Sequence, residues 1–369
     1  GLLAPLGLVK GFLAILTGHL IGTGFLACAG YISFVRKKNA MDSAACSFGS
    51  AGVKIIALCN VIQLLGWTII MVVQASGALT GMLPRLPFSL GALGLSLLVL
   101  VWALIFGSSA GRGLHGFIVI LVSVLCMVLF FEAASGGRGP YIPQGAVGTA
   151  LAVELSIAMP VSWLPLVGDY SCEADGPAAA ALMPFAGYFL GSVSMYMLGL
   201  FIAVRGGGDI FAFIAGSRFR LAAGAVALFS TLTTAFLDLY SAVISFRQFV
   251  KPKNEKLPLI AAGLFTMAVS SFFPAERYGQ FLESFLVTIG MVFVPVYGLL
   301  FMDFLFKAGP ARTVSPANLA IAAAGMAAYQ CFTRAGFFVP SLLTMVLVYI
   351  LYLLIRRPLM RAANKFERE

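Results

Sequence analysis

Charged side chains are scarce in this chain. Asp, Glu, Lys and Arg together make up 10% of its 369 residues, whereas about a quarter of the residues in a soluble domain are charged. Hydrophobic residues make up 60% of the chain, and the mean hydropathy is +1.00. This composition excludes an ordinary soluble domain and predicts an all-α polytopic membrane protein.

The residue patterns of most enzymes and metal sites are missing as well. The two histidines, His19 and His115, are far apart in sequence, and the six cysteines contain no CxxC pair. The sequence also lacks a GxxxxGK[ST] phosphate-binding loop, an HExxH zinc motif and a pair of carboxylates spaced for acid–base chemistry. We therefore expect a protein that is not an enzyme and that has no cofactor and no bound metal.

The chain has a net charge of +10, which in a soluble protein would suggest nucleic acid. Here Lys and Arg fall mainly between apolar segments, where they anchor the loops of a membrane protein. We expect the lipid bilayer as a partner and no nucleic acid. About 16 of the 24 basic residues lie in alternate connections and the C-terminal tail, and about 8 in the others. This bias predicts a multi-pass protein of the cytoplasmic (plasma) membrane with its C-terminus inside.

Eleven full apolar segments follow one another, each near the length of about 20 residues that a bilayer-spanning helix needs. They cover residues 11–35, 51–76, 88–108, 116–133, 148–169, 178–204, 221–246, 257–274, 279–306, 317–333 and 340–355. Residues 1–8 are too short to span a bilayer and resemble the tail of a preceding helix. We therefore expect twelve helices, of which the first is truncated in this sequence.

One apolar segment is interrupted near its middle, between Leu155 and Asp169. Pro160 and Pro165 lie there, and each proline lacks an N–H and clashes with the carbonyl four residues earlier. Polar backbone freed in this way is tolerated in a membrane only where it faces protein or water, and transporters use such breaks as binding sites. Ser162 and Trp163 between the prolines would add a hydroxyl and an aromatic face. The alternative is a proline kink that binds nothing.

A polar stripe runs along the segment 51–76. Asn60, Gln63, Trp67 and Gln74 fall within about 60° of one another at about 100° per residue. Membrane helices also use such residues for helix–helix hydrogen bonds, which is the structural alternative. The functional interpretation is a wall for a planar ligand, in which Trp67 stacks on the ring and an amide such as Gln63 binds ring nitrogens. Met71, one turn beyond Trp67, would add an apolar, polarisable contact.

Hydroxyl groups and a carboxylate share one face of the segment 221–246. The residues on this face are Thr231, Thr234, Asp238, Ser241 and Ser245. A single Ser or Thr in such a helix often bonds only to the preceding turn. Adjacent hydroxyls followed by a carboxylate favour a hard cation, which prefers oxygen ligands. A carboxylate inside a membrane segment is costly unless it is paired, protonated or functional.

Other polar residues and two loops are open to more than one interpretation. Glu154 is either a hydrated interfacial carboxylate or a gating or proton-transfer residue, and Asp169 and Asp303 are structural or gate residues. Residues 36–50 predict a short cytoplasmic amphipathic piece, and residues 205–220 predict a re-entrant or capping element outside.

Four motifs together resemble the nucleobase–cation symporter family 1. The broken segment, ending in Asp169-Tyr170-Ser171, resembles the family's sixth helix, although Cys172 replaces the basic residue that usually follows. Ser47-Phe48-Gly49 resembles the loop after the second helix, Gly66-Trp67 the third helix, and Pro295, Gly298 and Asp303 the tenth. Within the family, the runs Ala158 to Leu166 and Thr233 to Ser241 look most like the hydroxymethylpyrimidine transporter branch (CytX type).

The resemblance implies a LeuT-like fold with a five-plus-five inverted repeat and two added C-terminal helices. In one domain of residues 1–369, the first repeat would be 1–133, the second 148–306 and the added helices 317–355. By position, Trp67 would stack on the substrate, Ser162 and nearby backbone would bind it, and Thr233 and Thr234 would donate oxygens to the coupling cation. The expected substrate-binding residues are Gln63, Trp67, Met71, Pro160, Ser162, Trp163 and Asp238.

The predicted function is a secondary active transporter that imports a pyrimidine such as hydroxymethylpyrimidine with Na⁺ or H⁺. Asp238 would face an exocyclic amine or a hydroxymethyl group, because the Asn that some relatives place on the eighth helix is missing here. The alternative substrate is cytosine or a purine. Two other classes remain open, a non-transporting receptor and a polytopic membrane enzyme. The missing half of the first helix means either a fragment or a protein that does not transport as relatives do.

Overall fold

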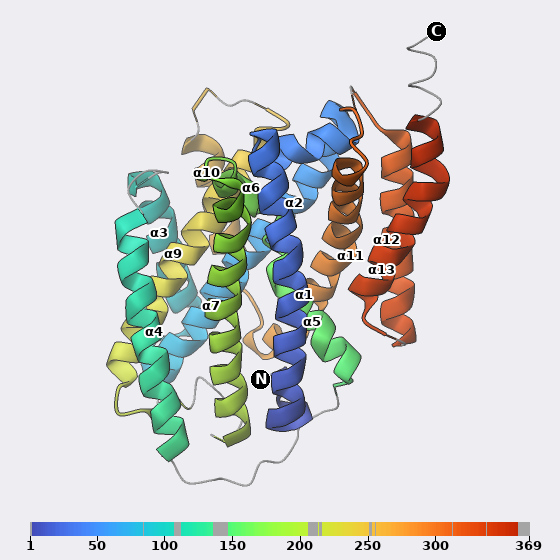
Figure 1. The fold of residues 1–369 in the computed structure, drawn as a ribbon. Helices are drawn as coiled ribbons and strands as arrows, with labels where there is room; N and C mark the ends of the chain where they lie inside the picture. Colours follow the sequence, from blue (N-terminus) through green and yellow to red (C-terminus); the bar gives the residue numbers. More distant parts are fainter. Residues whose placement is uncertain are drawn as a thin grey trace. The chain divides into compact units, whose positions relative to one another are not determined.

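A computed structural model describes residues 2–83, 85–106, 112–135, 147–205, 213, 216–250, 253–254, 256–311, 313–336 and 338–360. Within these ranges the regular secondary structure is entirely helical (Figure 1). The helices are η1 (Ala4–Leu6), α1 (Gly7–Arg36), α2 (Ala40–Met82), α3 (Phe88–Phe106), α4 (Arg112–Ser135), α5 (Thr149–Val161), α6 (Leu164–Ser171), α7 (Pro177–Arg205), α9 (Arg220–Phe246), α10 (Lys256–Ser271), η2 (Ala275–Arg277), α11 (Tyr278–Leu305), α12 (Pro316–Ala335), α13 (Pro340–Leu351) and η3 (Tyr352–Arg356).

The described residues of the eleven predicted apolar segments are mostly helical, and the expected interruption divides the fifth segment into α5 and α6. The short 3₁₀ turn η1 precedes α1, and Gly7 at their junction has φ +71°. Most of the predicted amphipathic stretch, residues 36–50, is also helical. The helix α2 begins at Ala40 within it and turns sharply at Gly49. Most of the predicted element at 205–220 lies outside the described residues.

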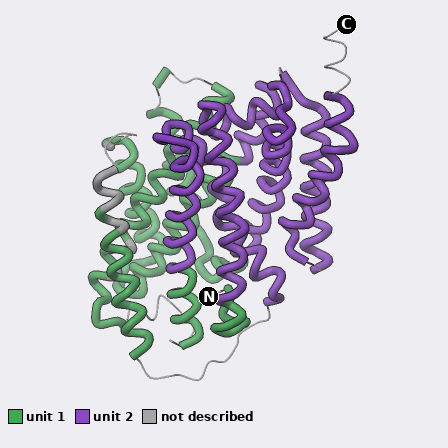
Figure 2. The backbone as a smooth tube through the Cα atoms, in the orientation of Figure 1, with its two compact units in different colours: residues 1–11, 60–146, 195–282 green, residues 12–59, 147–194, 283–369 purple. Residues whose placement is uncertain are grey.

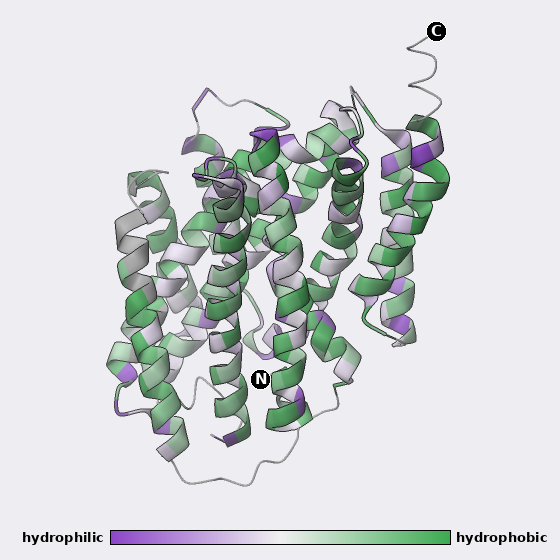
Figure 3. Ribbon diagram, in the orientation of Figure 1, coloured by the Kyte–Doolittle hydropathy of each residue, from purple (hydrophilic) through white to green (hydrophobic). Residues whose placement is uncertain are grey.

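Eight helical segments of the described chain are long and apolar enough to cross a membrane. They are Ala4–Arg36, Ala40–Met82, Phe88–Ile105, Thr149–Ser171, Pro177–Arg205, Leu228–Phe246, Ala275–Leu305 and Pro340–Met360. Two shorter apolar helices are Ile120–Ser135 and Lys256–Ser271. Hydrophobic residues run along the helices, and the most hydrophilic residues gather toward helix ends (Figure 3). The chain is therefore a multi-pass membrane protein, as its composition predicts.

The chain divides into two compact units, each made of three separate segments (Figure 2). Unit 1 contains Gly1–Gly11, Asn60–Ala146 and Met195–Leu282, and unit 2 contains Phe12–Cys59, Val147–Ser194 and Glu283–Glu369. Each unit takes segments from both predicted repeats, so the units do not coincide with the repeats. The inverted repeat itself stays a prediction.

Unit 1 has an apolar core in which α3 packs against α9 and α10. Its buried side chains are Val99, Leu100, Ala103, Leu232, Ala235, Phe236, Leu239, Val243 and Leu259. Gly263 on α10 makes this approach possible, because a Cβ there would lie 2.6 Å from a methyl carbon of Leu100. The core therefore holds one side of α9 firmly in place.

Unit 2 contains the broken helix and the hairpin of α12 and α13, which run side by side (Figure 1). The turn inside α2 also belongs to this unit. Gly49 adopts φ +83°, which favours glycine, and a Cβ there would collide with the carbonyl oxygen of Thr313. Backbone N–H groups of Ala51 and Ser315 bond to Thr313 and Phe48 carbonyls at 2.9 and 3.1 Å. The segment after α11 is thereby tied to the turn.

Candidate functional site

The interruption between α5 and α6 is a tight turn. The Trp163 N–H bonds to the Pro160 carbonyl at 3.1 Å, three residues back, and the Leu166 N–H bonds to the Trp163 carbonyl at 3.0 Å. Pro165 has no N–H to offer the carbonyl of Val161. The two prolines therefore end one helix and begin the next within a single membrane segment.

The three predicted site residues in this turn differ in exposure. Pro160 and Ser162 are buried, and Trp163 is half-buried. The Ser162 hydroxyl donates to the Met159 carbonyl at 2.6 Å. The Trp163 ring meets the Tyr188 ring edge-on at 5.9 Å between centroids. The indole is thus held from α7 while part of it stays accessible.

Two glycines of α1 allow the broken helix to approach closely. A Cβ on Gly18 would lie 2.6 Å from the Val153 carbonyl oxygen, and a Cβ on Gly22 would lie 2.8 Å from the Ile157 carbonyl oxygen. A Cβ on Gly22 would also collide with the ring of Pro160. Small residues four apart are a known way to bring two membrane helices together. The position of the turn is therefore set by α1.

The polar stripe on α2 lies in unit 1, and some of its side chains form hydrogen bonds to other residues of the protein. Asn60 is fully buried and donates to the Ser245 hydroxyl of α9 at 2.7 Å. Gln63 donates to the Asn60 side-chain oxygen at 2.9 Å. Asn60 therefore fulfils the structural alternative, a helix–helix hydrogen bond. Gln74, at the other end of the stripe, accepts a long bond of 3.4 Å from Tyr278.

Trp67 and Met71 occupy different surroundings on α2. Trp67 is 7% exposed. Met71 is half-buried and packs against the apolar core of unit 1, so part of this side chain has a packing role. Whether either residue touches substrate stays a prediction.

On α9 the predicted cation residues and the carboxylate differ in their bonding. The Thr233 hydroxyl lies 3.0 Å from both the Phe229 and the Ser230 carbonyls, as is common for Thr in membrane helices. Thr234 is half-buried. Asp238 is 4% exposed, and within the described part of the chain no hydrogen bond or ion pair reaches its carboxylate. Asp238 is thus the unit's buried acid without a protein partner.

Glu154 on α5 is bonded very differently, and the expectation of a hydrated interfacial carboxylate is wrong. The side chain is fully buried. It accepts hydrogen bonds from the Tyr329 hydroxyl at 2.6 Å and from the Ser341 hydroxyl and N–H at 2.5 and 2.9 Å. Glu154 thereby fastens α5 to the α12–α13 hairpin. Tyr329 and Ser341 could not be identified from the sequence, because no local pattern marks a partner so distant along the chain.

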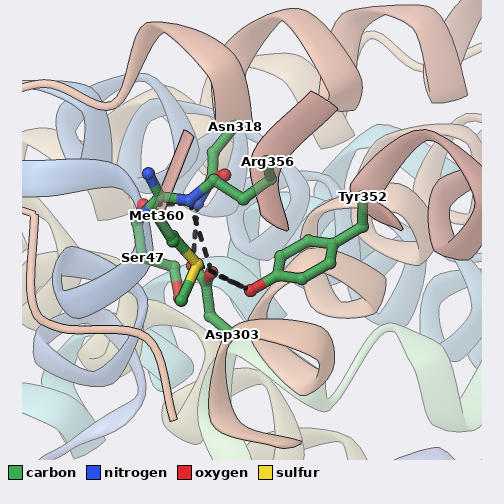
Figure 4. Close-up of polar contacts among 6 residues, drawn as sticks. All are labelled: Ser47, Asp303, Asn318, Tyr352, Arg356 and Met360. Atoms are coloured by element: carbon green, nitrogen blue, oxygen red, sulfur yellow. Dashed lines mark hydrogen bonds and ion pairs between the residues drawn. The ribbon is translucent and has the colours of Figure 1, made fainter. Parts of the chain in front are cut away.

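Asp303 at the end of α11 forms a second such cluster (Figure 4). It accepts from the Asn318 amide at 2.8 Å and the Tyr352 hydroxyl at 2.9 Å, and Arg356 lies 3.6 Å away. Asn318 also donates to the Ser47 carbonyl at 2.7 Å. The cluster therefore joins α11, α12, η3 and the turn before Gly49, which agrees with the structural interpretation of Asp303.

Asp169 at the end of α6 caps another helix. Its carboxylate accepts from the Ala40 N–H at 3.0 Å, at the first residue of α2. Burial raises the pKa of the nearby Cys172 thiol, and the carboxylates of Glu173 and Asp169 raise it further. The thiol is therefore uncharged at neutral pH and does not replace the positive charge that the family motif has at this position.

No group of three or more His, Cys, Asp or Glu side chains in the described ranges is arranged to hold a metal ion. The predicted substrate residues fall into two sets, one in each compact unit. Gln63, Trp67, Met71 and Asp238 belong to unit 1, whereas Pro160, Ser162 and Trp163 belong to unit 2.

No protein-family model and no curated protein sequence matches this chain. Among solved structures, it resembles Mhp1, a nucleobase-cation-symport-1 family transporter, in a closed conformation with bromovinylhydantoin bound. The TM-score is 0.72 at 17% identity, over 97% of this chain and 86% of that one. The inward-facing conformation of Mhp1 gives 0.72 at 16% identity, over 97% and 84%. The LeuT-like fold expected from the sequence is thereby confirmed.

Proposed function

We propose that this protein is a secondary active transporter that imports a pyrimidine, such as hydroxymethylpyrimidine, together with Na⁺ or H⁺. The observation that carries the proposal is the turn at Ser162 and Trp163 inside the membrane segment Thr149–Ser171. A helix interrupted at this depth leaves backbone polar groups unpaired by the helix, and secondary transporters use such groups for substrate and ion. The likeness to Mhp1 supports the same conclusion, because that transporter has a planar heterocycle bound.

The proposed contacts divide by chemistry. Aromatic and apolar contacts to the ring come from Trp67, Met71, Pro160 and Trp163, and polar contacts come from Gln63, Ser162 and Asp238. Where the coupling cation is Na⁺, Thr233 and Thr234 donate oxygens to it. Side chains of these kinds suit a small flat ring with polar groups at its edge, because aromatic faces can stack on the ring while polar groups form hydrogen bonds to its edge. The C-terminus lies in the cytoplasm.

Uptake by the full chain in proteoliposomes tests the proposal. Radiolabelled hydroxymethylpyrimidine is expected to accumulate under an inward Na⁺ or H⁺ gradient and to leak out when the gradient is collapsed. Competition with unlabelled cytosine, adenine and hypoxanthine measures the alternative substrates. Accumulation of a nucleobase without any uptake of hydroxymethylpyrimidine would replace the substrate and keep the transporter. Binding without flux under either gradient would show a receptor and contradict the proposal.

The stacking role of Trp67 has its own test. Trp67→Ala is expected to weaken substrate binding by about 1–3 kcal/mol, by analogy with bases stacked on aromatic residues. Trp67→Phe, which keeps an aromatic face, should lose much less. Calorimetry or scintillation proximity on the purified variants measures both values, and unchanged affinity in Trp67→Ala would remove this residue from the site.

A further inference from the structure

Two polar groups on one face of α9 are buried without a partner in the described chain. Asp238 is 4% exposed and Ser241, three residues on, is 1% exposed. The Ser241 hydroxyl is buried and unpaired, and the Asp238 carboxylate accepts no hydrogen bond from a described residue. Residues three apart on a helix are neighbours on its surface. A carboxyl and a hydroxyl are therefore presented side by side with their hydrogen-bonding capacity unused.

Ionisable groups are few on the helices that pack against α9 in unit 1. The α2 part of the unit, Asn60 to Met82, contains none, and neither does α3. Lys256 is the first residue of α10, and α4 contributes Arg112, His115, Cys126 and Glu132. On α9 itself the groups are Arg220 and Tyr240, with Arg220 about 27 Å along the helix from Asp238 at about 1.5 Å per residue.

Of these groups, Tyr240 lies on another side of the helix and Glu132 is hydrogen-bonded to other residues. Tyr240 lies two positions from Asp238, on another side of the helix, and packs on Phe236 at 6.0 Å between ring centroids. Glu132 accepts from the Ser217 hydroxyl at 2.5 Å and the Arg218 N–H at 3.0 Å. No cation of unit 1 within the described residues forms an ion pair with Asp238.

A buried carboxylate with no partner charge is unstable as an anion, because desolvation costs several kcal/mol. The neutral acid avoids this cost. It then presents one O–H donor beside one carbonyl acceptor. An aminopyrimidine presents the complementary pair along its edge, a ring nitrogen acceptor beside an exocyclic N–H donor.

We propose that Asp238 carries the coupling proton and, in its protonated form, recognises the aminopyrimidine edge of the substrate. The inference rests on the proposed transport function and names its ion and its substrate class. A proton from outside binds the carboxylate and forms the O–H bond. The O–H then donates to the ring nitrogen while the carbonyl accepts from the exocyclic N–H. On the inside the substrate leaves, the O–H bond breaks, and the proton passes to water.

The substitution Asp238→Asn separates recognition from proton transfer. An amide presents the same donor beside an acceptor, but it cannot release a proton at this pH. Wild-type affinity for 4-amino-5-hydroxymethyl-2-methylpyrimidine is expected to fall as pH rises, since deprotonation removes the donor. In Asp238→Asn the affinity should no longer vary with pH, and accumulation driven by an acid-outside gradient in proteoliposomes should fall about tenfold or more.

Glu132→Gln is the matched control, because it makes the same change to a capping carboxylate of the same unit. It should keep both pH-dependent binding and accumulation. Wild-type accumulation that needs a Na⁺ gradient at equal pH, and that Asp238→Asn retains, would overturn the inference and leave the transport function standing. A wild-type protein that neither binds nor accumulates any pyrimidine would instead contradict the proposed function.

A ligand change tests the same contact without altering the protein. The analogue that lacks the 4-amino group cannot donate to the carbonyl oxygen of Asp238. Losing that bond is expected to weaken binding about tenfold. Wild-type protein that binds both compounds equally would overturn the inference, even if Asp238→Asn failed to fold.

Discussion

Three carboxylates are buried to a similar degree in the two units, yet their surroundings differ completely. Glu154 and Asp303 in unit 2 are 0% and 3% exposed, and Asp238 in unit 1 is 4% exposed. Tyr329 and Ser341 bond to Glu154, and Asn318 and Tyr352 bond to Asp303. Asp238 has no such bond among the described residues. Equal burial therefore does not mean an equal role.

Glu154 and Asp303 hold helices together, whereas Asp238 bonds to no described residue. Glu154 binds where α12 ends and α13 begins, while Asp303 binds the start of α12 and the end of α13. The hairpin is thus attached at both ends, to α5 by one acid and to α11 by the other. A carboxylate whose lone pairs are filled by the protein has little left for a ligand. Asp238 accepts no hydrogen bond from a described residue, so its oxygens can still bond to a ligand, and it is the better candidate for a functional acid.

Among the variants that test this comparison, Glu154→Ala is expected to lower the free energy of unfolding the most. It leaves the Tyr329 hydroxyl and the Ser341 N–H buried without an acceptor, which should cost about 3–5 kcal/mol of unfolding free energy. Chemical denaturation in detergent measures this loss. The exposed residue Glu173 provides the control, since Glu173→Ala should stay within about 0.5 kcal/mol. Equal stability of the two variants would mean that Glu154 does not fasten the hairpin.

The next effect concerns the position of the broken helix. Gly22→Ala places a methyl group against Pro160 and 2.8 Å from the Ile157 carbonyl oxygen, so we expect a loss of about 1–3 kcal/mol and reduced uptake. Gly24→Ala on the same helix meets nothing within 4 Å and should leave both unchanged. Thermal unfolding and uptake are measured for the pair. Identical behaviour would show that α1 does not set the position of the turn.

A smaller effect is expected inside unit 1 from Asn60→Ala. It removes the 2.7 Å bond to Ser245, and interhelical bonds of this kind contribute about 0.6 kcal/mol on average and about 1.7 at most. A double-mutant cycle with Ser245→Ala isolates the interaction. Strict additivity of the two losses would show that the bond does not hold α2 to α9.

The smallest stability effect is expected for Asp238→Asn. An acid without a protein partner loses nothing when it becomes an amide, so the unfolding free energy should change by less than about 0.5 kcal/mol. The same denaturation experiment as for Glu154→Ala gives a direct comparison. A loss of about 2 kcal/mol or more would reveal a structural partner for Asp238, and the contrast between the two units would fail.

Several features of the site were predictable from local sequence, and others were not. The interruption follows from Pro160 and Pro165 alone, because the missing N–H groups act within one turn. The resemblance placed a loop at Ser47-Phe48-Gly49, but the left-handed backbone of Gly49, with φ +83°, was not predicted. The burial of Glu154 could not be foreseen, because its partners are 175 and 187 residues away. The use of Asn60 could not be decided either, because a polar stripe is compatible with a ligand or with a neighbouring helix.

The sequence by itself determined that this is a membrane protein, where its helices run and which of them breaks. These properties depend on hydropathy over about 20 residues and on proline geometry, both of which are local. Only the tertiary structure decided which buried acid is satisfied and which is left over. That distinction depends on side chains brought together from distant helices, and it separates Glu154 and Asp303, which are hydrogen-bonded within the protein, from Asp238, to which no described residue bonds.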